Sequence, residues 1–111
     1  MTELSTLKEQ VCNSIDKNRD MLLSISHEIH SNPELAFEEF KASKLLSDES
    51  EKVGMNVVRE AYGLETAYAS DFGNDGPRVA ILSEYDALPG IGHSCGHNII
   101  ATTGFGAAAA L

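Results

Sequence analysis

The sequence predicts an α/β fold: a layered sandwich of two helices, three strands and a C-terminal helix. Three observations lead to this prediction. Apolar residues near the N-terminus recur at a helical spacing, and that spacing is lost after Gly54. A continuous apolar run, Arg78-Val79-Ala80-Ile81-Leu82-Ser83, then follows between turn residues. Such a run is typical of a strand covered on both faces, so we predict it as the centre of the sheet.

The first predicted helix extends from Thr2, its expected N-cap, to Ser31. Pro33 ends it, because proline disfavours the helical region for the residue before it. A second helix is predicted over 36–52, with Gly54 as a natural stop. The apolar positions of the first helix lie close to 3.6 residues apart, with charged residues between them: Leu4, Leu7, Val11, Ile15, Leu22, Ile25 and Ile29.

Two short strands are predicted next, over 55–61 and 65–71. A dense turn signal of glycine, asparagine, aspartate and proline at 73–77 separates them from the apolar run at 78–83. Together the three segments suggest a β-meander between the helices.

The C-terminal helix is predicted from Ile99 onward, with Asn98 as its N-cap. Gly104 and Gly106 lie inside this helix, where each costs about 1 kcal/mol relative to alanine. We therefore expect them to allow a close approach to the sheet. The alanine run reaches Leu111 without a C-capping signal, so we expect the chain to be part of a longer protein.

Composition excludes several functional classes. The 111 residues are 42% hydrophobic, which is typical of one small globular domain or part of a larger one. Seventeen acidic residues against eight basic ones give a net charge of −9, which repels nucleic acid and anionic membranes. Cys12 and Cys95 lie far apart, and the N-terminus has no signal-peptide pattern. We expect free thiols and a soluble cytoplasmic protein with no nucleic-acid or membrane partner.

The residues best suited to catalysis or metal binding lie at 84–98, directly after the predicted central strand and before a helix. Ligand sites in open α/β sheets lie at this edge. His93, Cys95 and His97 are spaced two apart, so in an extended stretch they project to one side. Thiolate and imidazole together suit zinc, and Gly96 between them allows a close backbone approach.

Two carboxylates, Glu84 and Asp86, begin the same segment. One is able to bind an ion, while the other orients a ligand histidine. The same residues also fit a plainer interpretation, in which the carboxylates are strand-end charges and the Cys-Gly-His triplet is structural. Cys12 fits a packed free thiol, and His27 and His30 fit ordinary surface or capping positions.

Two segments in this order resemble the M20 metallopeptidase and amidohydrolase family. The first, Glu28-Ile29-His30 with Pro33-Glu34-Leu35-Ala36-Phe37-Glu38-Glu39, is similar to its N-terminal signature. The second, Glu84-Tyr85-Asp86-Ala87-Leu88-Pro89 with Gly92-His93-Ser94-Cys95-Gly96-His97-Asn98, resembles its metal-binding region in the amidohydrolase branch. The continuation Asn98-Ile99-Ile100 most resembles the aminobenzoyl-glutamate hydrolase and M20-domain dipeptidase subgroup. The resemblance extends from about Leu23 to Leu111.

The resemblance implies Cys95 and His97 as metal ligands and Asp86 as the catalytic acidic residue behind the metal centre. It also implies a divalent metal, Zn or Mn, with two ions in the full-length enzyme. Glu84 stands where other branches have a ligand histidine, and His93 receives no assigned role. The family hydrolyses amides with metal assistance and a glutamate base. That base and the remaining ligands lie downstream of the cysteine motif.

We therefore predict a metal-dependent amidohydrolase or dipeptidase that acts on a small amide or dipeptide and is a homodimer at full length. Residues 1–111 are expected to be a partial catalytic domain without the lid or dimerisation domain, inactive on its own. One alternative is a short non-catalytic protein that binds metal or a partner, or the product of a decayed gene. Another is a cysteine hydrolase with Cys95 as the nucleophile and a nearby histidine as the base.

Overall fold

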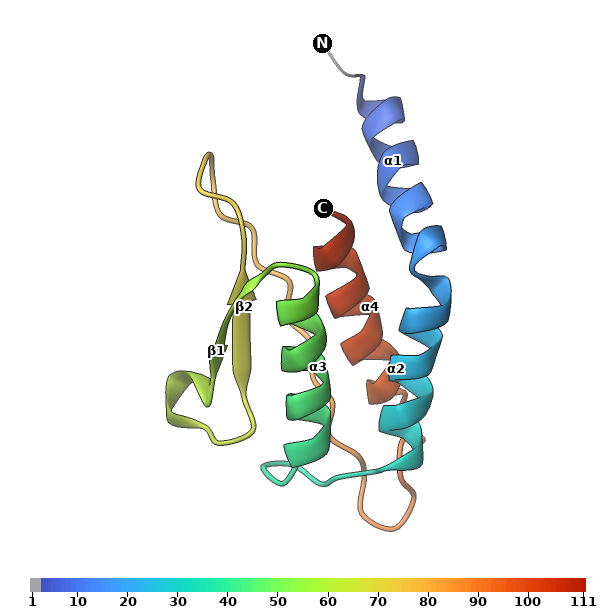
Figure 1. Ribbon diagram of the computed structural model, residues 1–111. Coiled ribbons are helices and arrows are strands. Elements are labelled where there is room, and N and C mark those ends of the chain that lie inside the picture. The colour runs from blue at the N-terminus through green and yellow to red at the C-terminus, as the bar shows by residue number, and fades with distance from the viewer. Residues whose placement is uncertain (1–2) are drawn as a thin grey trace.

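The computed structural model describes residues 3–111. Four α-helices and a two-stranded sheet form over these residues, which confirms the predicted mixture of helix and strand. Helices α2, α3 and α4 lie side by side, and the β-hairpin packs beside α3 (Figure 1). Within residues 3–111, no helix is long and apolar enough to span a bilayer. The elements in chain order are α1 (Leu4–Lys17), α2 (Arg19–Ser31), α3 (Phe40–Lys52), β1 (Asn56–Arg59), a 3-10 turn (Ala61–Gly63), β2 (Tyr68–Asp71) and α4 (His97–Ala110).

The predicted single helix over 2–31 is wrong in its continuity, because Asn18 divides it into α1 and α2. The backbone of Asn18 has φ −96° and ψ 11°, outside the helical range. Its side-chain amide donates to the carbonyl oxygen of Ser14 at 3.0 Å. Such local bonding by asparagine offers the backbone an alternative to the helix. The predicted cap Thr2 lies outside the described residues.

Helix α3 begins at Phe40, four residues later than predicted, and Glu34 determines this start. Phe37 has φ 67°, in the left-handed region, so the chain turns there instead of entering a helix at 36. The Glu34 carboxylate accepts the backbone N–H groups of Lys41 and Ala42, each at 2.9 Å. These N–H groups belong to the first turn, where no helix carbonyl is available. Glu34 therefore caps α3 from outside the helix.

The two strands are shorter than predicted and pair antiparallel. Asn56 lies opposite Asp71, and Arg59 lies opposite Tyr68. The Arg59 guanidinium donates to Asp48 and Glu51 on α3, with N–O distances of 2.7 Å each. These exposed ion pairs orient the hairpin against α3 and contribute little stability of their own.

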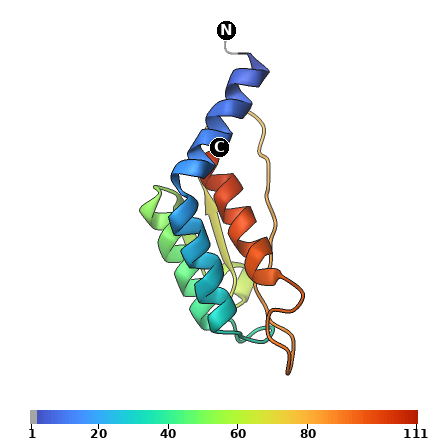
Figure 2. The same cartoon turned by 90° about the vertical axis from the view of Figure 1, so that its right-hand side faces the viewer.

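The predicted central strand at 78–83 is not a strand. Among residues 3–111, β1 and β2 are the strands that form, and they pair only with each other. Val79 and Leu82 are 83% and 86% exposed, opposite to the two-sided burial that the apolar run predicts. Burial of this run needs a neighbouring strand and a covering layer on its outer face, and neither lies within the described chain. The segment instead runs as an extended trace alongside α4 (Figure 2).

The core lies where α2, α3 and α4 meet. Gly106 allows α4 to approach α2 closely, because a Cβ atom there would lie 3.1 Å from the Leu22 side chain. A Cβ at Gly104 would lie 2.7 Å from Ser83 Oγ. The prediction of close packing at these glycines is confirmed, but the neighbours are a helix and the extended segment, not the sheet. The buried core cluster consists of Ile25, Ile29, Ala42, Leu46, Tyr85, Ala101 and Phe105.

Glu34→Ala is expected to lower the free energy of unfolding by about 1–2 kcal/mol, because it removes both charge-assisted caps of α3. Urea denaturation followed by circular dichroism measures the change. Glu38→Ala, an exposed residue in the same turn, is the matched control and should leave the midpoint unchanged. Equal midpoints for the two variants would show that the cap does not stabilise the fold.

Candidate functional site

The loop from Glu84 to Gly96 is joined to the segment before α3 by a backbone hydrogen bond and is closed by two more of its own. The Ala87 N–H donates to the Glu34 carbonyl oxygen at 2.7 Å. Leu88 and Gly92 exchange N–H···O bonds of 2.9 and 3.2 Å, which closes a tight turn. Gly92 has φ 62°, and a Cβ atom there would meet Pro33 at 3.8 Å. The two motifs identified in the sequence, one around Glu34 and one in this loop, are therefore in direct contact.

The first turn of α4 presents the candidate ligands, but Asn98 is not its N-cap as predicted. Gly96 occupies that position with φ 85°, a left-handed conformation that glycine adopts without strain. Asn98 lies in the first turn and is buried. Its side-chain amide donates to Ser26 Oγ at 3.1 Å on α2. Asn98 therefore fixes α4 to α2 and leaves His97 at the first helical position.

His97 and Asp86 form the best-defined polar contact of the site. His97 Nδ1 lies 2.8 Å from Asp86 Oδ1 and 2.9 Å from the Asp86 carbonyl oxygen. A carbonyl oxygen only accepts, so Nδ1 is the nitrogen that carries a proton and donates. In the neutral ring, the lone pair is then on Nε2. Asp86 therefore orients the ring and determines which nitrogen is available to a ligand.

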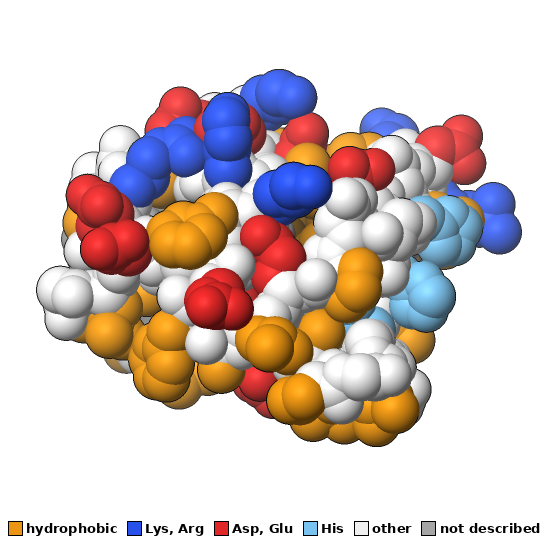
Figure 3. Space-filling model, turned by 90° about the horizontal axis from the view of Figure 1, so that it is seen from below, with side chains coloured by type: hydrophobic (Ala, Val, Ile, Leu, Met, Phe, Trp, Pro, Cys, Tyr) orange, Lys and Arg blue, Asp and Glu red, His pale blue; other side chains and the backbone are white. Residues whose placement is uncertain are grey.

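Glu84 lies on the other side of the same ring. Its Oε1 is 3.5 Å from His97 Nε2, and its side chain is 56% exposed, against 22% for His97. Two carboxylates therefore flank one imidazole, so the site is locally acidic and favours a cation. Figure 3 shows the end of the molecule where this loop lies, with histidine side chains gathered toward the right, charged side chains mainly in the upper part and hydrophobic side chains mainly along the lower part.

Cys95 is exposed, two residues before His97. Its thiolate, the His97 Nε2 and a carboxylate are donors of the types that bind zinc, and Asp86 supplies the outer hydrogen bond that zinc-binding histidines usually make. The donor types thus fit a divalent metal. Over residues 3–111, however, no three His, Cys, Asp or Glu side chains are placed to hold an ion together. The residues that this chain supplies are a partial ligand set.

The sequence predicted no role for His93, and this residue is buried in the structure. The residue is 6% exposed, and neither ring nitrogen has a hydrogen-bond partner among the described residues. Its centroid lies 6.4 Å from that of His30 on α2. Burial lowers the pKa of His93, and the neighbouring His30 and His97 lower it further. Its alternation with Cys95 and His97 predicted one shared face, but His93 is buried whereas Cys95 is exposed.

Sequence reasoning did not assign a site role to Glu34, although Pro33-Glu34 stands in the first motif. The motif was the one feature of the sequence that could have indicated this role, because helix and strand propensities do not link residue 34 to residue 87.

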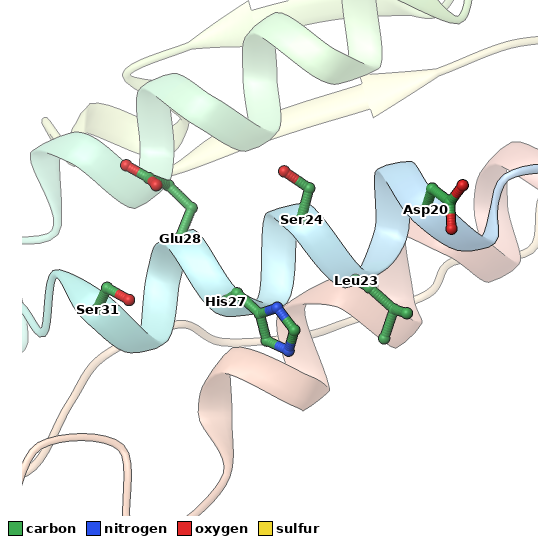
Figure 4. Close-up of a pocket in the computed structure, with 6 residues that line it drawn as sticks. All are labelled: Asp20, Leu23, Ser24, His27, Glu28 and Ser31. Carbon is green, nitrogen blue, oxygen red and sulfur yellow. The ribbon is translucent and has the colours of Figure 1, made fainter.

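A shallow hollow on the surface is separate from this loop. It lies along the outer face of α2, and all six residues that line it come from that helix (Figure 4). Binding pockets usually enclose a ligand between several elements. A stripe of one helix has no second wall, so this hollow is not a candidate active site. Its lining residues are Asp20, Leu23, Ser24, His27, Glu28 and Ser31.

His93→Leu is expected to raise the free energy of unfolding by about 1 kcal/mol, because it removes two buried nitrogens without partners. Chemical denaturation at pH 8 measures the change. His27→Leu, an exposed histidine on α2, is the matched control and should have no effect. A loss of stability in His93→Leu alone would show that the ring nitrogens are satisfied in the folded protein.

No protein-family model matches the chain, but several proteins are similar to it. Xaa-Arg dipeptidase from Mus musculus is 41% identical over 98% of this chain and 28% of its own length. One of the subunits of the p-aminobenzoyl-glutamate hydrolase from Escherichia coli (strain K12) is 33% identical over 88% of this chain and 24% of its own length. Thermostable carboxypeptidase 2 of Saccharolobus solfataricus is 34% identical over 83% of this chain and 27% of its own length.

The chain thus spans about a quarter of the length of these relatives. A putative amidohydrolase from Bacillus subtilis (strain 168) is 26% identical over 86% of this chain. The names of the relatives are those of peptidases and amidohydrolases, which are hydrolases. Over most of its length the chain is related to these peptidases and amidohydrolases, which is consistent with the resemblance of its two motifs to the M20 family.

Proposed function

We propose that this chain contributes part of the metal centre of an amide-bond hydrolase, with Cys95 and His97 as ligands. One observation carries the proposal. His97 Nδ1 donates to Asp86, which leaves the Nε2 lone pair directed away from Asp86 in an acidic surrounding. Zinc-binding histidines in proteins are typically held in this way by a carboxylate or a carbonyl, and here both accept from one nitrogen.

Each residue has a distinct task in this proposal. The Cys95 sulfur and His97 Nε2 are the donor atoms, and thiolate with imidazole favours zinc over manganese. Asp86 is a positioning residue, since its contact is with His97. Cys95 and His97 would hold a divalent ion, which would supply Lewis acidity toward an amide carbonyl and a water molecule. Glu84 adds negative charge beside the ring, so it favours cation binding without being required as a ligand.

The complete activity needs groups beyond those described. A catalytic zinc site usually has three protein ligands and one open position, and this chain offers two assigned donors. We therefore propose that the chain alone binds metal weakly and does not hydrolyse amides. The names of the relatives support a dipeptide or small amide as the substrate of a complete enzyme. A general base and the substrate contacts would come from further sequence.

The geometry does not favour a cysteine hydrolase. Such an enzyme needs a histidine nitrogen directed at the thiol to act as its base. Here His97 directs Nδ1 at Asp86, and its Nε2 lies 3.5 Å from Glu84. This histidine is arranged between two carboxylates and is suited to a cation.

Cys95→Ala is expected to abolish zinc binding that is measurable by isothermal titration at pH 7.5, because it removes one of two donors. Cys12→Ala is the matched control, since Cys12 is the other exposed cysteine and lies on α1. The titration is made on this chain and on any longer polypeptide that its gene encodes. Equal zinc affinities for the two variants would contradict the proposed ligand.

Asp86→Asn is expected to weaken zinc binding by roughly 10- to 100-fold, the usual effect of losing a carboxylate that orients a ligand histidine. In a complete enzyme, the activity should fall with metal occupancy and recover in part at high zinc. Ser94→Ala, an exposed neighbour in the same loop, is the control. An unchanged zinc affinity in Asp86→Asn would show that the contact of Asp86 with His97 does not orient a metal ligand.

A further inference from the structure

Asp86 lies between two anchors that hold the chain on either side of it. Before it, the hydroxyl of the buried Tyr85 donates to the carbonyl oxygen of Thr66, in the segment that leads into β2. After it, the N–H of the buried Ala87 donates to the carbonyl oxygen of Glu34. Both acceptors lie outside the loop that carries Asp86. The backbone of Asp86 is therefore fixed from both sides.

The contact between Asp86 and His97 needs this fixed backbone. His97 Nδ1 lies 2.9 Å from the carbonyl oxygen of Asp86 and 2.8 Å from its Oδ1. The carbonyl of Asp86 and the N–H of Ala87 belong to one planar peptide group, so the bond from Ala87 determines where that carbonyl points. A rotation of the peptide would withdraw the acceptor that fixes the proton on Nδ1. The tautomer of His97 thus depends on anchors outside the contact itself.

Tyr85 also directs both carboxylates toward the same ring. In an extended stretch, neighbouring side chains point to opposite faces. With Tyr85 held in the core, Glu84 and Asp86 point to the other face, and both lie within 3.5 Å of a ring nitrogen of His97. The side chain between the two carboxylates therefore decides their direction.

The acceptor of the Tyr85 hydroxyl is itself held in place. Thr66 is buried, and its hydroxyl donates to Glu39 Oε1 at 3.0 Å, directly before α3. The ring of Tyr85 stacks on that of Tyr68 in β2, with centroids 6.3 Å apart and an interplanar angle of 21°. Burial raises the pKa of Tyr85, so its hydroxyl remains protonated at neutral pH and donates. The anchor thus extends from the start of α3 to the residue before Asp86.

We propose that Tyr85 is a positioning residue, which orients Asp86 and through it determines the tautomer of His97. Thr66 and Glu39 act through the same bond, because they hold the carbonyl oxygen that accepts the Tyr85 hydroxyl. The consequence for metal binding rests on the proposed function, since a proton fixed on Nδ1 keeps the Nε2 lone pair available to an ion. The positioning itself requires no metal, so it can be measured on the chain alone.

Nitrogen-15 NMR of the metal-free chain at pH 8 reports the tautomer of His97, whose signals are assigned by their loss in His97→Gln. We expect one tautomer, with Nδ1 protonated, in the parent chain. Tyr85→Phe removes only the hydroxyl and should give a mixture of the two tautomers. Tyr68→Phe is the matched control, because it makes the same change on the stacked ring and should keep the single tautomer. A mixture in the parent chain, a single tautomer in Tyr85→Phe, or equal mixtures in the two variants would overturn the proposal.

Zinc titration is the second readout. Tyr85→Phe should raise the zinc dissociation constant roughly tenfold, toward the lower end of the usual effect of losing a partner that orients a ligand. Thr66→Val removes the hydroxyl that contacts Glu39, keeps the carbonyl, and should raise the constant by a smaller factor. The double variant should bind no more weakly than Tyr85→Phe alone, since both changes act through one bond. Additive losses in the double variant would overturn the role of Thr66.

The two readouts separate this inference from the proposed function. If the parent chain binds no zinc but Tyr85→Phe mixes the tautomers, the positioning role stands and the proposed metal centre fails. If the parent chain binds zinc and Tyr85→Phe changes neither the tautomer nor the affinity, the positioning role fails and the metal centre stands. Circular dichroism establishes that each variant is folded. Should Tyr85→Phe not fold, Thr66→Val provides the same test of the tautomer with a side chain of nearly the same shape.

Discussion

Glu34 joins the two halves of the candidate site, and the arrangement of the loop depends on it. Its carboxylate caps α3 through Lys41 and Ala42, while its own carbonyl oxygen accepts the Ala87 N–H at 2.7 Å. One residue thus fixes where a helix begins and where the loop bearing Asp86 passes. Two motifs separated by some fifty residues therefore meet at this point, and the loop that carries Asp86 passes beside the turn at Pro33.

The contact between Asp86 and His97 determines the orientation and the tautomer of the His97 ring. Nδ1 is held by two oxygen acceptors of one residue, so the ring has little freedom to rotate or to change tautomer. Gly96 starts α4 in a left-handed conformation, and Asn98 ties its first turn to Ser26 on α2. The histidine is therefore presented in one orientation before any ion arrives. Preorganisation of this kind lowers the entropy lost on binding.

Local pattern predicted most of the helices and both short strands, because amphipathic spacing and turn residues act over a few positions. The local pattern failed where side chains distant in the sequence determine an element's boundaries. Helix α3 starts at Phe40 because of a carboxylate six residues earlier, and the helix at the N-terminus divides because the Asn18 side chain bonds backward. The apolar run at 78–83 has a strand sequence but has no neighbouring strand among the described residues. Candidate residues Asp86 and His97 were predicted from a motif, whereas the burial of His93 follows from packing against α2.

Helix α1 buries none of its residues, and Leu4 and Leu7 on its apolar face are 66% and 47% exposed. A lone helix of its fourteen residues is marginal in water, since tertiary packing usually supplies helical stability. Helix α1 contacts α4 but contributes no residue to the buried core cluster, so it is able to fray while the remainder holds. Amide protons of α1 would then exchange with solvent faster than those of α2, α3 and α4. We therefore expect the cooperatively folded part of the chain to begin at Arg19, with α1 as an appended arm.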